Sequence, residues 1–186
     1  MHFKFYINIV DIFSHSLWTG LIYRKEKKIW WPIIFSVAPD LFSNGIYVVI
    51  SIFKGISFVD STRVHLNPVG PEIIPTLYSF SHSLVFFAIA FIAVWLILKK
   101  PWWPLAAWGI HILVDIPFHS VKYFATPFLY PLSSFSIDSI NWGDNNYILA
   151  INFCVLAVIY FALYITKNKR KHLVTYFNAK RKLVKR

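Results

Sequence analysis

Long apolar stretches separated by short charged runs are the feature of this sequence that most restricts its fold. Hydrophobic residues make up 57% of the 186 residues and charged residues only 15%, so a water-soluble domain of this size could not bury its apolar surface. About 20 helical residues are needed to cross the roughly 30 Å hydrocarbon core of a bilayer. Five stretches reach this length: 3–23, 29–53, 73–98, 102–121 and 146–166. The sequence therefore predicts an all-α, polytopic integral membrane bundle with about five spans.

The first stretch is the least apolar of the five, because it contains Lys4, Asp11 and His15. It is predicted either to span the membrane or to enter it as a re-entrant or interfacial segment. Residues 1–166 are interpreted as one membrane-embedded helical domain, and residues 167–186 as a basic cytoplasmic tail.

The basic residues gather in three of the segments that separate or follow these stretches. Residues 24–28, 99–100 and 167–186 hold 15 of the 19 lysines and arginines. With five spans, all three segments lie on one side of the membrane, which the positive-inside rule identifies as the cytoplasm. The N-terminus is then predicted outside and the C-terminus inside. Contact with membrane lipid explains the net charge of +11, so lipid is expected as a partner and nucleic acid is not.

The pentapeptide Phe-Ser-His-Ser-Leu occurs twice, at residues 13–17 and 80–84. Each copy lies in a predicted span that runs from outside to inside, and the next span carries an aspartate, Asp40 or Asp115. This arrangement suggests two helical hairpins related by a rough two-fold axis along the membrane normal. Chance recurrence in an apolar sequence is the alternative.

Ionisable residues from four predicted spans fall at nearly one depth. With each span centred on its midpoint, His15, Asp40 and His111 lie within about 3 Å of the mid-plane, and His82 and Asp115 about 5–6 Å toward the outside. An aspartate at a helix centre costs about 2.5–3.5 kcal/mol on insertion. Two aspartates and three histidines are therefore tolerated only if they neutralise one another, bind a cation or line a wet cavity. We predict that these five residues face one another.

The spacing of His111 and Asp115 supports this interpretation. The two residues are four apart, so they lie on one face of a helix and can bind a cation together, or the carboxylate can orient the imidazole. His119 follows after four more residues. Pro117 is expected to kink the helix before His119, because proline lacks the backbone donor that a continuous helix needs.

Pro39 is expected to act in the same way beside Asp40. A proline at this position is predicted to break the second span, and a broken membrane helix normally lines a cavity. The alternative is that Asp40 and the residues after it form a simple turn, which would make this span a short hairpin.

Four short motifs together resemble a known family. They are His15 in Ser-His-Ser-Leu-Trp-Thr-Gly, Pro39-Asp40, Ser81-His82-Ser83, and His111-Ile-Leu-Val-Asp115. Their order is similar to that of the bacterial membrane-bound metal-dependent hydrolases of the LexA-regulated inner-membrane type, and more distantly to zinc-dependent phospholipase C. The resemblance covers residues 8–135, and it implies a bacterial-type cytoplasmic membrane and a metal cluster held by His and Asp.

One segment departs from the family pattern. Members often carry His-Arg-x-x-Thr-His-Ser before the third span, whereas residues 77–83 read Leu-Tyr-Ser-Phe-Ser-His-Ser. The first histidine and the arginine are missing. The resemblance therefore implies neither a full set of metals nor a phosphate-binding arginine in this chain.

The leading hypothesis is a membrane-embedded metal-dependent hydrolase acting from the outer face on a phosphoester or lipid-linked substrate. The expected ligands of one or two divalent cations, with zinc favoured by the imidazole-rich set, are His15, Asp40, His82, His111 and Asp115. The attacking group would be a metal-bound water. Asp11 and His119 are the candidates for a catalytic acid or base at the mouth of the cavity.

Two other functions fit many of the same residues. Intramembrane His and Asp also build proton or cation pathways in transporters, although the inner halves of the third and fourth predicted spans are almost wholly apolar, which favours a site open to one side. The third hypothesis is a scaffold in which a metal only clamps the helices together.

Overall fold

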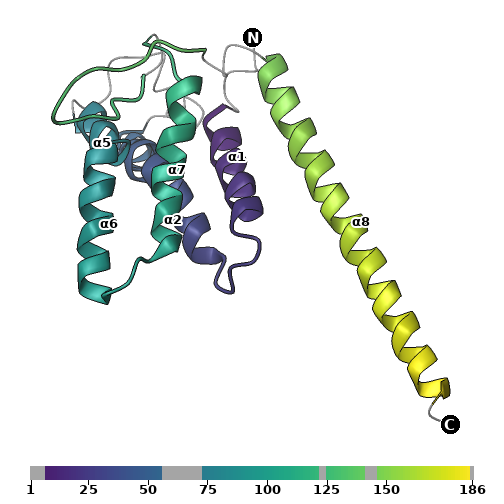
Figure 1. The fold of residues 1–186 in the computed structure, drawn as a ribbon. Helices are drawn as coiled ribbons and strands as arrows, with labels where there is room; N and C mark the ends of the chain where they lie inside the picture. The colour runs from purple at the N-terminus through teal and green to yellow at the C-terminus, as the bar shows by residue number, and fades with distance from the viewer. Residues whose placement is uncertain (1–6, 56–72, 122–124, 141–145, 185–186) are drawn as a thin grey trace. The chain divides into compact units, whose positions relative to one another are not determined.

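Every regular element that the structure describes is a helix (Figure 1). The computed structural model describes residues 7–55, 73–121, 125–140 and 146–184, and for these the all-α prediction is confirmed. The chain divides into two compact units, Met1–Asn146 and Tyr147–Arg186. The first unit contains α1 (Ile7–Ile22), α2 (Trp30–Asp40), α3 (Ile46–Phe53), α5 (Ile73–Ser81), α6 (Leu84–Leu98) and α7 (Ala106–Asp115).

The second unit is formed by α8 (Asn146–Val184), a helix of 39 residues. Over Tyr147–Lys171 it is the one described helix that is long and apolar enough to cross a membrane by itself. The backbone stays helical past residue 166, so no interruption separates the apolar stretch from the basic tail. At about 1.5 Å per residue, the whole helix is about 58 Å long.

The described residues contain fewer long continuous helices than the five spans that the sequence predicts. The pair α5 and α6 meets the criteria for a second crossing only when it is counted as one span, with a bend of 54° between its halves. Helix α1 has 16 residues, fewer than the about 20 that cross a bilayer without distortion. Five spans therefore remain a prediction.

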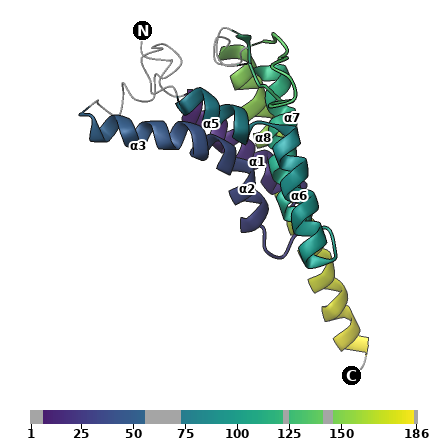
Figure 2. The same cartoon turned by 90° about the vertical axis from the view of Figure 1, so that its left-hand side faces the viewer.

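Three of the predicted spans are interrupted beside a predicted cluster residue. The irregular segments are the π-helix Leu41–Gly45 after Asp40, residues 82–83 between α5 and α6, and the 3-10 turn Ile116–Phe118 after Asp115. In Figure 2, α3 runs across the direction of α2. Interrupted helices are tolerated at membrane depth where the freed backbone groups are buried in protein or line a cavity.

The second span is interrupted just after Pro39 and Asp40, where the sequence predicted a break. Pro39 itself lies inside α2, which continues to Asp40, and the chain then widens into the π-helix instead of forming a simple turn. Because proline has no backbone N–H, the Phe35 carbonyl one turn earlier in α2 loses the donor that a regular helix would give it. The Ser43 hydroxyl donates a hydrogen bond to the Pro39 carbonyl (3.0 Å). Asp40 is thus held at a bend that remains hydrogen-bonded.

The break between α5 and α6 is fixed by Ser83. This residue has an extended backbone (φ −100°, ψ 124°), and its side chain accepts hydrogen bonds from the amides of Val85 (3.1 Å) and Phe86 (3.3 Å). Such an N-cap satisfies amides that the helix leaves free. The Ser83 hydroxyl also donates to the Tyr130 carbonyl, and the Leu84 amide donates to the Phe128 carbonyl (2.9 Å).

Many of the buried side chains of the first unit are polar, and many large apolar side chains are exposed. Helix α2 packs against both α1 and α7, and α6 packs against α7. The Thr19 hydroxyl donates to the Ser36 hydroxyl across the buried contact of α1 and α2 (2.8 Å). Trp30 is 72% exposed and Ile97 77% exposed. Exposed apolar area on this scale indicates a surface that contacts membrane or protein.

Candidate metal centre

The structure brings together all five residues that the sequence proposed as ligands. His15 comes from the middle of α1, and Asp40 and Asp115 are the last residues of α2 and α7. His82 directly follows α5, and His111 lies one turn before Asp115. All five are buried, with 0–6% of their surface exposed. The three interruptions lie at these residues, because two helices end at an aspartate and a third ends just before a histidine.

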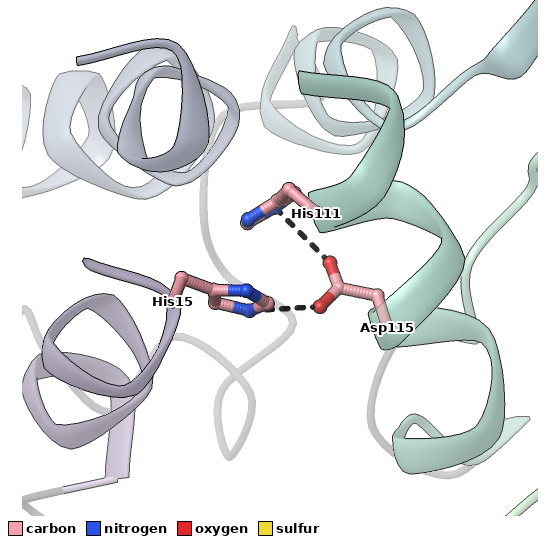
Figure 3. A group of neighbouring side chains, drawn as sticks. All are labelled: His15, His111 and Asp115. Atoms are coloured by element: carbon pink, nitrogen blue, oxygen red, sulfur yellow. Dashed lines mark ion pairs between the residues drawn. The ribbon is translucent and has the colours of Figure 1, made fainter. Parts of the chain in front are cut away.

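One half of the cluster is built around the Asp115 carboxylate (Figure 3). Its Oδ1 lies 3.0 Å from Nε2 of His15, and its Oδ2 lies 3.2 Å from Nε2 of His111. The two imidazole rings face each other with centroids 4.0 Å apart. One carboxylate therefore joins α1 to α7.

The other half of the cluster is built around His82. Its Nε2 lies 3.4 Å from Oδ1 of Asp40, 3.4 Å from Oδ2 of Asp115 and 3.2 Å from Nε2 of His111. His111 Nε2 lies 3.8 Å from the same Asp40 oxygen. His111 is thus shared between the two halves.

These distances suit a metal ion. The ligand atoms of His15, His111 and Asp115 lie within 4.8 Å of one another, as do those of Asp40, His82 and His111. Ligands at 2.0–2.2 Å from a tetrahedral zinc ion are about 3.4 Å apart, and the separations around His82 and His111 run from 3.2 to 3.8 Å. Each of the two groups could hold a metal ion, and each is also joined by internal ion pairs.

The hydrogen bonds of His82 determine which of its nitrogens can bind a cation. Nδ1 lies 3.1 Å from the Tyr78 carbonyl oxygen, which can only accept a hydrogen bond, and 2.9 Å from the Ser81 hydroxyl. In the neutral ring Nδ1 then carries the proton and Nε2 carries the lone pair. That lone pair faces two carboxylate oxygens at 3.4 Å. This contact is repulsive unless a proton or a cation lies between the atoms.

The Asp40 carboxylate gives a second indication that the cluster could hold a cation. Its Oδ2 is buried and has no hydrogen-bond partner within the part of the chain that the structure describes. A buried carboxylate oxygen without a partner is costly, and a bound cation would offset that cost. The three imidazoles and two carboxylates form two groups that could each hold a metal ion.

The two proposed acid or base residues differ in what the structure shows. His119 follows the 3-10 turn, and its Nδ1 donates to the Asp115 carbonyl (3.1 Å), so it lies beside the cluster without joining either group of ligands. The regular helix ends before Pro117, as predicted. Asp11 lies in α1 one turn before His15, and its side chain is outside the described residues.

Tyr78 and Trp108 were not identified from the sequence. The Tyr78 ring stacks on the His82 ring with centroids 3.9 Å apart, and its carbonyl accepts from His82. The Trp108 indole N–H donates to the Ser81 carbonyl (2.7 Å). Tyr78 precedes His82 by four residues, which is the one signal in the sequence that could have identified it.

The two copies of the repeated pentapeptide have different backbones but direct their histidines to the same cluster. The first copy lies inside α1, where the Ser16 hydroxyl donates to the Ile12 carbonyl (2.8 Å). The second lies across the break, where the corresponding Ser83 caps α6.

Comparison of the chain with protein-family models, curated proteins and solved structures finds no match. The resemblance to membrane-bound hydrolases therefore remains a prediction.

Proposed function

We propose that the protein is a membrane-embedded metal-dependent hydrolase that cleaves a phosphoester or lipid-linked substrate. The observation that carries this proposal is the convergence of the His82, His111, Asp40 and Asp115 ligand atoms at 3.2–3.8 Å in a buried site. His15, bonded to Asp115, completes a set that suits one or two zinc ions. Neutral imidazoles and carboxylates are common ligands of hydrolytic zinc.

The protein side chains have distinct roles in this proposal. A bound divalent cation would supply a Lewis acid and a water that ionises near neutral pH. Tyr78 and Ser81 hold the His82 ring so that Nε2 points at the cluster, as outer hydrogen bonds orient metal-binding histidines elsewhere. His119 donates its Nδ1–H to the Asp115 carbonyl, and this bond would hold its imidazole beside the cluster for proton exchange with substrate.

We further propose that both units are embedded in a bacterial-type cytoplasmic membrane, with the N-terminus outside and about five segments in the bilayer. The exposed apolar side chains of the first unit support this setting, as does the basic character of residues 24–28 and 99–100. The cluster would open toward the outer face.

Metal content is the first test. Wild type and the His82→Ala and Asp115→Ala variants are purified in detergent, loaded with zinc, dialysed and measured by elemental mass spectrometry. His172→Ala, in the basic tail, is the control for loss of a histidine. The proposal expects about one or two ions per chain in wild type and in the control, and loss in both cluster variants. A folded wild type that binds no divalent ion would refute the hydrolase and favour a proton or cation pathway.

Hydrolysis is the second test. Metal-loaded protein is assayed with bis(p-nitrophenyl) phosphate and with phospholipids, and His119→Gln is compared with wild type. The expected result is turnover that requires metal and falls about 100-fold or more in His119→Gln while metal content is unchanged. Stoichiometric metal without turnover of either substrate class would favour the scaffold hypothesis, in which the metal only clamps the helices.

A further inference from the structure

A large apolar cavity lies next to the His/Asp cluster in the first unit. Its volume is about 850 Å³, and its walls come from α2, the π-helix, the end of α5, α6 and the start of α7; the helices can be followed in Figure 2. Among the described residues that line it, Ser81 alone has a hydroxyl, amide or ionisable side chain. The indole N–H of the lining residue Trp108 is already bonded to the Ser81 carbonyl. The cavity therefore suits a hydrocarbon ligand.

One end of the cavity lies near the cluster, although none of the five cluster residues lines it. Pro39 and Ser81 line it, and each is bonded in the chain to a cluster residue, Asp40 or His82. From there the lining extends along α6 from Phe86 to Val94, a rise of about 12 Å at 1.5 Å per residue. A ligand that fills the cavity lengthwise thus has one end beside the cluster.

The cavity also has an exposed apolar rim. Ile34 is 49% exposed, Leu41 51% and Phe42 49%, and all three line the cavity. In the proposed topology these side chains face lipid, so a chain could enter sideways from the bilayer. The same topology directs the cavity from the outer-side cluster toward the cytoplasm, which is the direction of an acyl chain in the outer leaflet.

We propose that this cavity holds one acyl chain of a phospholipid and thereby places the headgroup phosphate at the His/Asp cluster. The placement of the headgroup rests on the proposed hydrolase function, whereas the acyl-chain site stands on the cavity itself. Lipid tails are as apolar as the lining, so the cavity gains little from the hydrophobic effect inside a bilayer. Its contribution is positional, since a chain seated in the cavity fixes the depth and orientation of the phosphodiester.

The test uses a phosphatidylglycerol that carries a diazirine in one acyl chain, incorporated into nanodiscs with the full-length protein. After illumination, labelled residues are located by mass spectrometry. Ala90 lines the cavity on α6, and Ala90→Trp fills it; Ala88→Trp adds the same side chain at an exposed position of α6 outside the lining. Adducts on Tyr147–Lys171 of α8 report contact with bulk lipid.

The expected result is labelling of cavity residues such as Ala38 in wild type and Ala88→Trp, and its loss in Ala90→Trp with α8 labelling unchanged. A Tm in detergent that matches wild type confirms that Ala90→Trp is folded. Val94→Phe, at the far end of the lining, replaces it if it is not. Labelling confined to α8, or unchanged cavity labelling in the folded variants, would overturn the proposal.

Hydrolysis separates this proposal from the one on which it rests. Filling the cavity should lower turnover of long-chain phosphatidylglycerol roughly 10- to 100-fold, the cost of misplacing a reacting group, and leave bis(p-nitrophenyl) phosphate turnover unchanged. Cavity labelling without metal or turnover would keep the acyl-chain site and refute the hydrolase. If Ala90→Trp hydrolyses both substrates as fast as wild type, the hydrolase function is supported, but the cavity does not place the headgroup.

Discussion

Replacing Gly109 by alanine should force α6 and α7 apart at the point where they approach most closely. A Cβ at this position would lie 2.6 Å from Cε1 and 2.7 Å from Cζ of Phe87, about 0.8 Å short of the 3.4 Å at which ordinary contact begins. The Phe87 ring has limited room to move, because it packs against the rings of Phe91 (5.7 Å between centroids) and Trp108 (5.8 Å). Overpacking of this kind costs about 1–3 kcal/mol.

Thermal unfolding in detergent micelles measures this cost. For a chain of this length each kcal/mol lowers Tm by about 2–4 °C, so a cost of about 1–3 kcal/mol should lower it by roughly 2–12 °C in Gly109→Ala. Gly45→Ala is the matched control, since a Cβ there would meet only Leu41 atoms at 3.7 and 3.8 Å, and its Tm should stay within about 2 °C of wild type. His111 lies two residues after Gly109, so zinc affinity should fall together with Tm.

Phe87→Leu provides the decisive comparison. The smaller side chain leaves room for the new methyl group, so Phe87→Leu should be less harmful in the Gly109→Ala background than in wild type. The coupling in this double-mutant cycle should be about 1 kcal/mol or more. A wild-type Tm in Gly109→Ala, or strictly additive effects in the double variant, would show that the two helices do not meet as described.

Three further predictions concern the contacts that hold the site. Ser83→Ala removes the α6 cap and its bond to Tyr130 and should lower the free energy of unfolding by about 1–2 kcal/mol. Ser16→Ala, at the same place in the repeat, should lower it by at most about 0.5 kcal/mol in the same unfolding assay. Equal effects of the two substitutions would contradict the structural difference between the two copies. Thr19→Val and Ser36→Ala should each lower the free energy of unfolding by about 1–3 kcal/mol, because each leaves one hydroxyl of their buried hydrogen bond unpaired. The double variant should lose less stability than the sum of the two single losses. Additive losses would show that the two hydroxyls are not bonded to each other. Zinc at about 100 times its Kd should stabilise wild type by about 2.7 kcal/mol and raise Tm by roughly 5–10 °C. A chelator should reverse this rise in Tm, and His82→Ala should not show it. An equal rise in His82→Ala would show that the ion binds elsewhere.

The sequence predicted which residues would meet but not how the backbone brings them together. The cost of Asp40 and Asp115 in lipid predicted that they face histidines, a cation or a wet cavity, and three histidines lay close to the same depth. The depth calculation assumed straight helices and placed His82 several ångströms from His15. The 54° bend between α5 and α6 makes such a calculation unreliable for His82, since depth along a straight axis no longer measures its position.

The interruptions themselves depended on contacts between distant segments. The break at Ser83 is held by carbonyls of Phe128 and Tyr130, and no local pattern of residues indicates which carbonyl a serine will reach. The identical residues of the first copy remain helical around Ser16. Local sequence alone therefore could not distinguish the two copies. The roles of Tyr78 and Ser81 were missed for the same reason, because they act through bonds formed at the break.

The origin of the cluster from four separate helical regions has a consequence for how the protein is made. Asp40 is synthesised after His15 but before His82, His111 and Asp115. In the proposed membrane setting, the growing chain would deliver this carboxylate to the bilayer before most of its partners exist. Asp40→Asn should therefore improve early insertion of the segment around α2 even though it impairs the finished cluster. Keeping Asp40 for the site would then make membrane insertion of this segment less favourable. The insertion machinery would have to hold the first hairpin until α7 emerges.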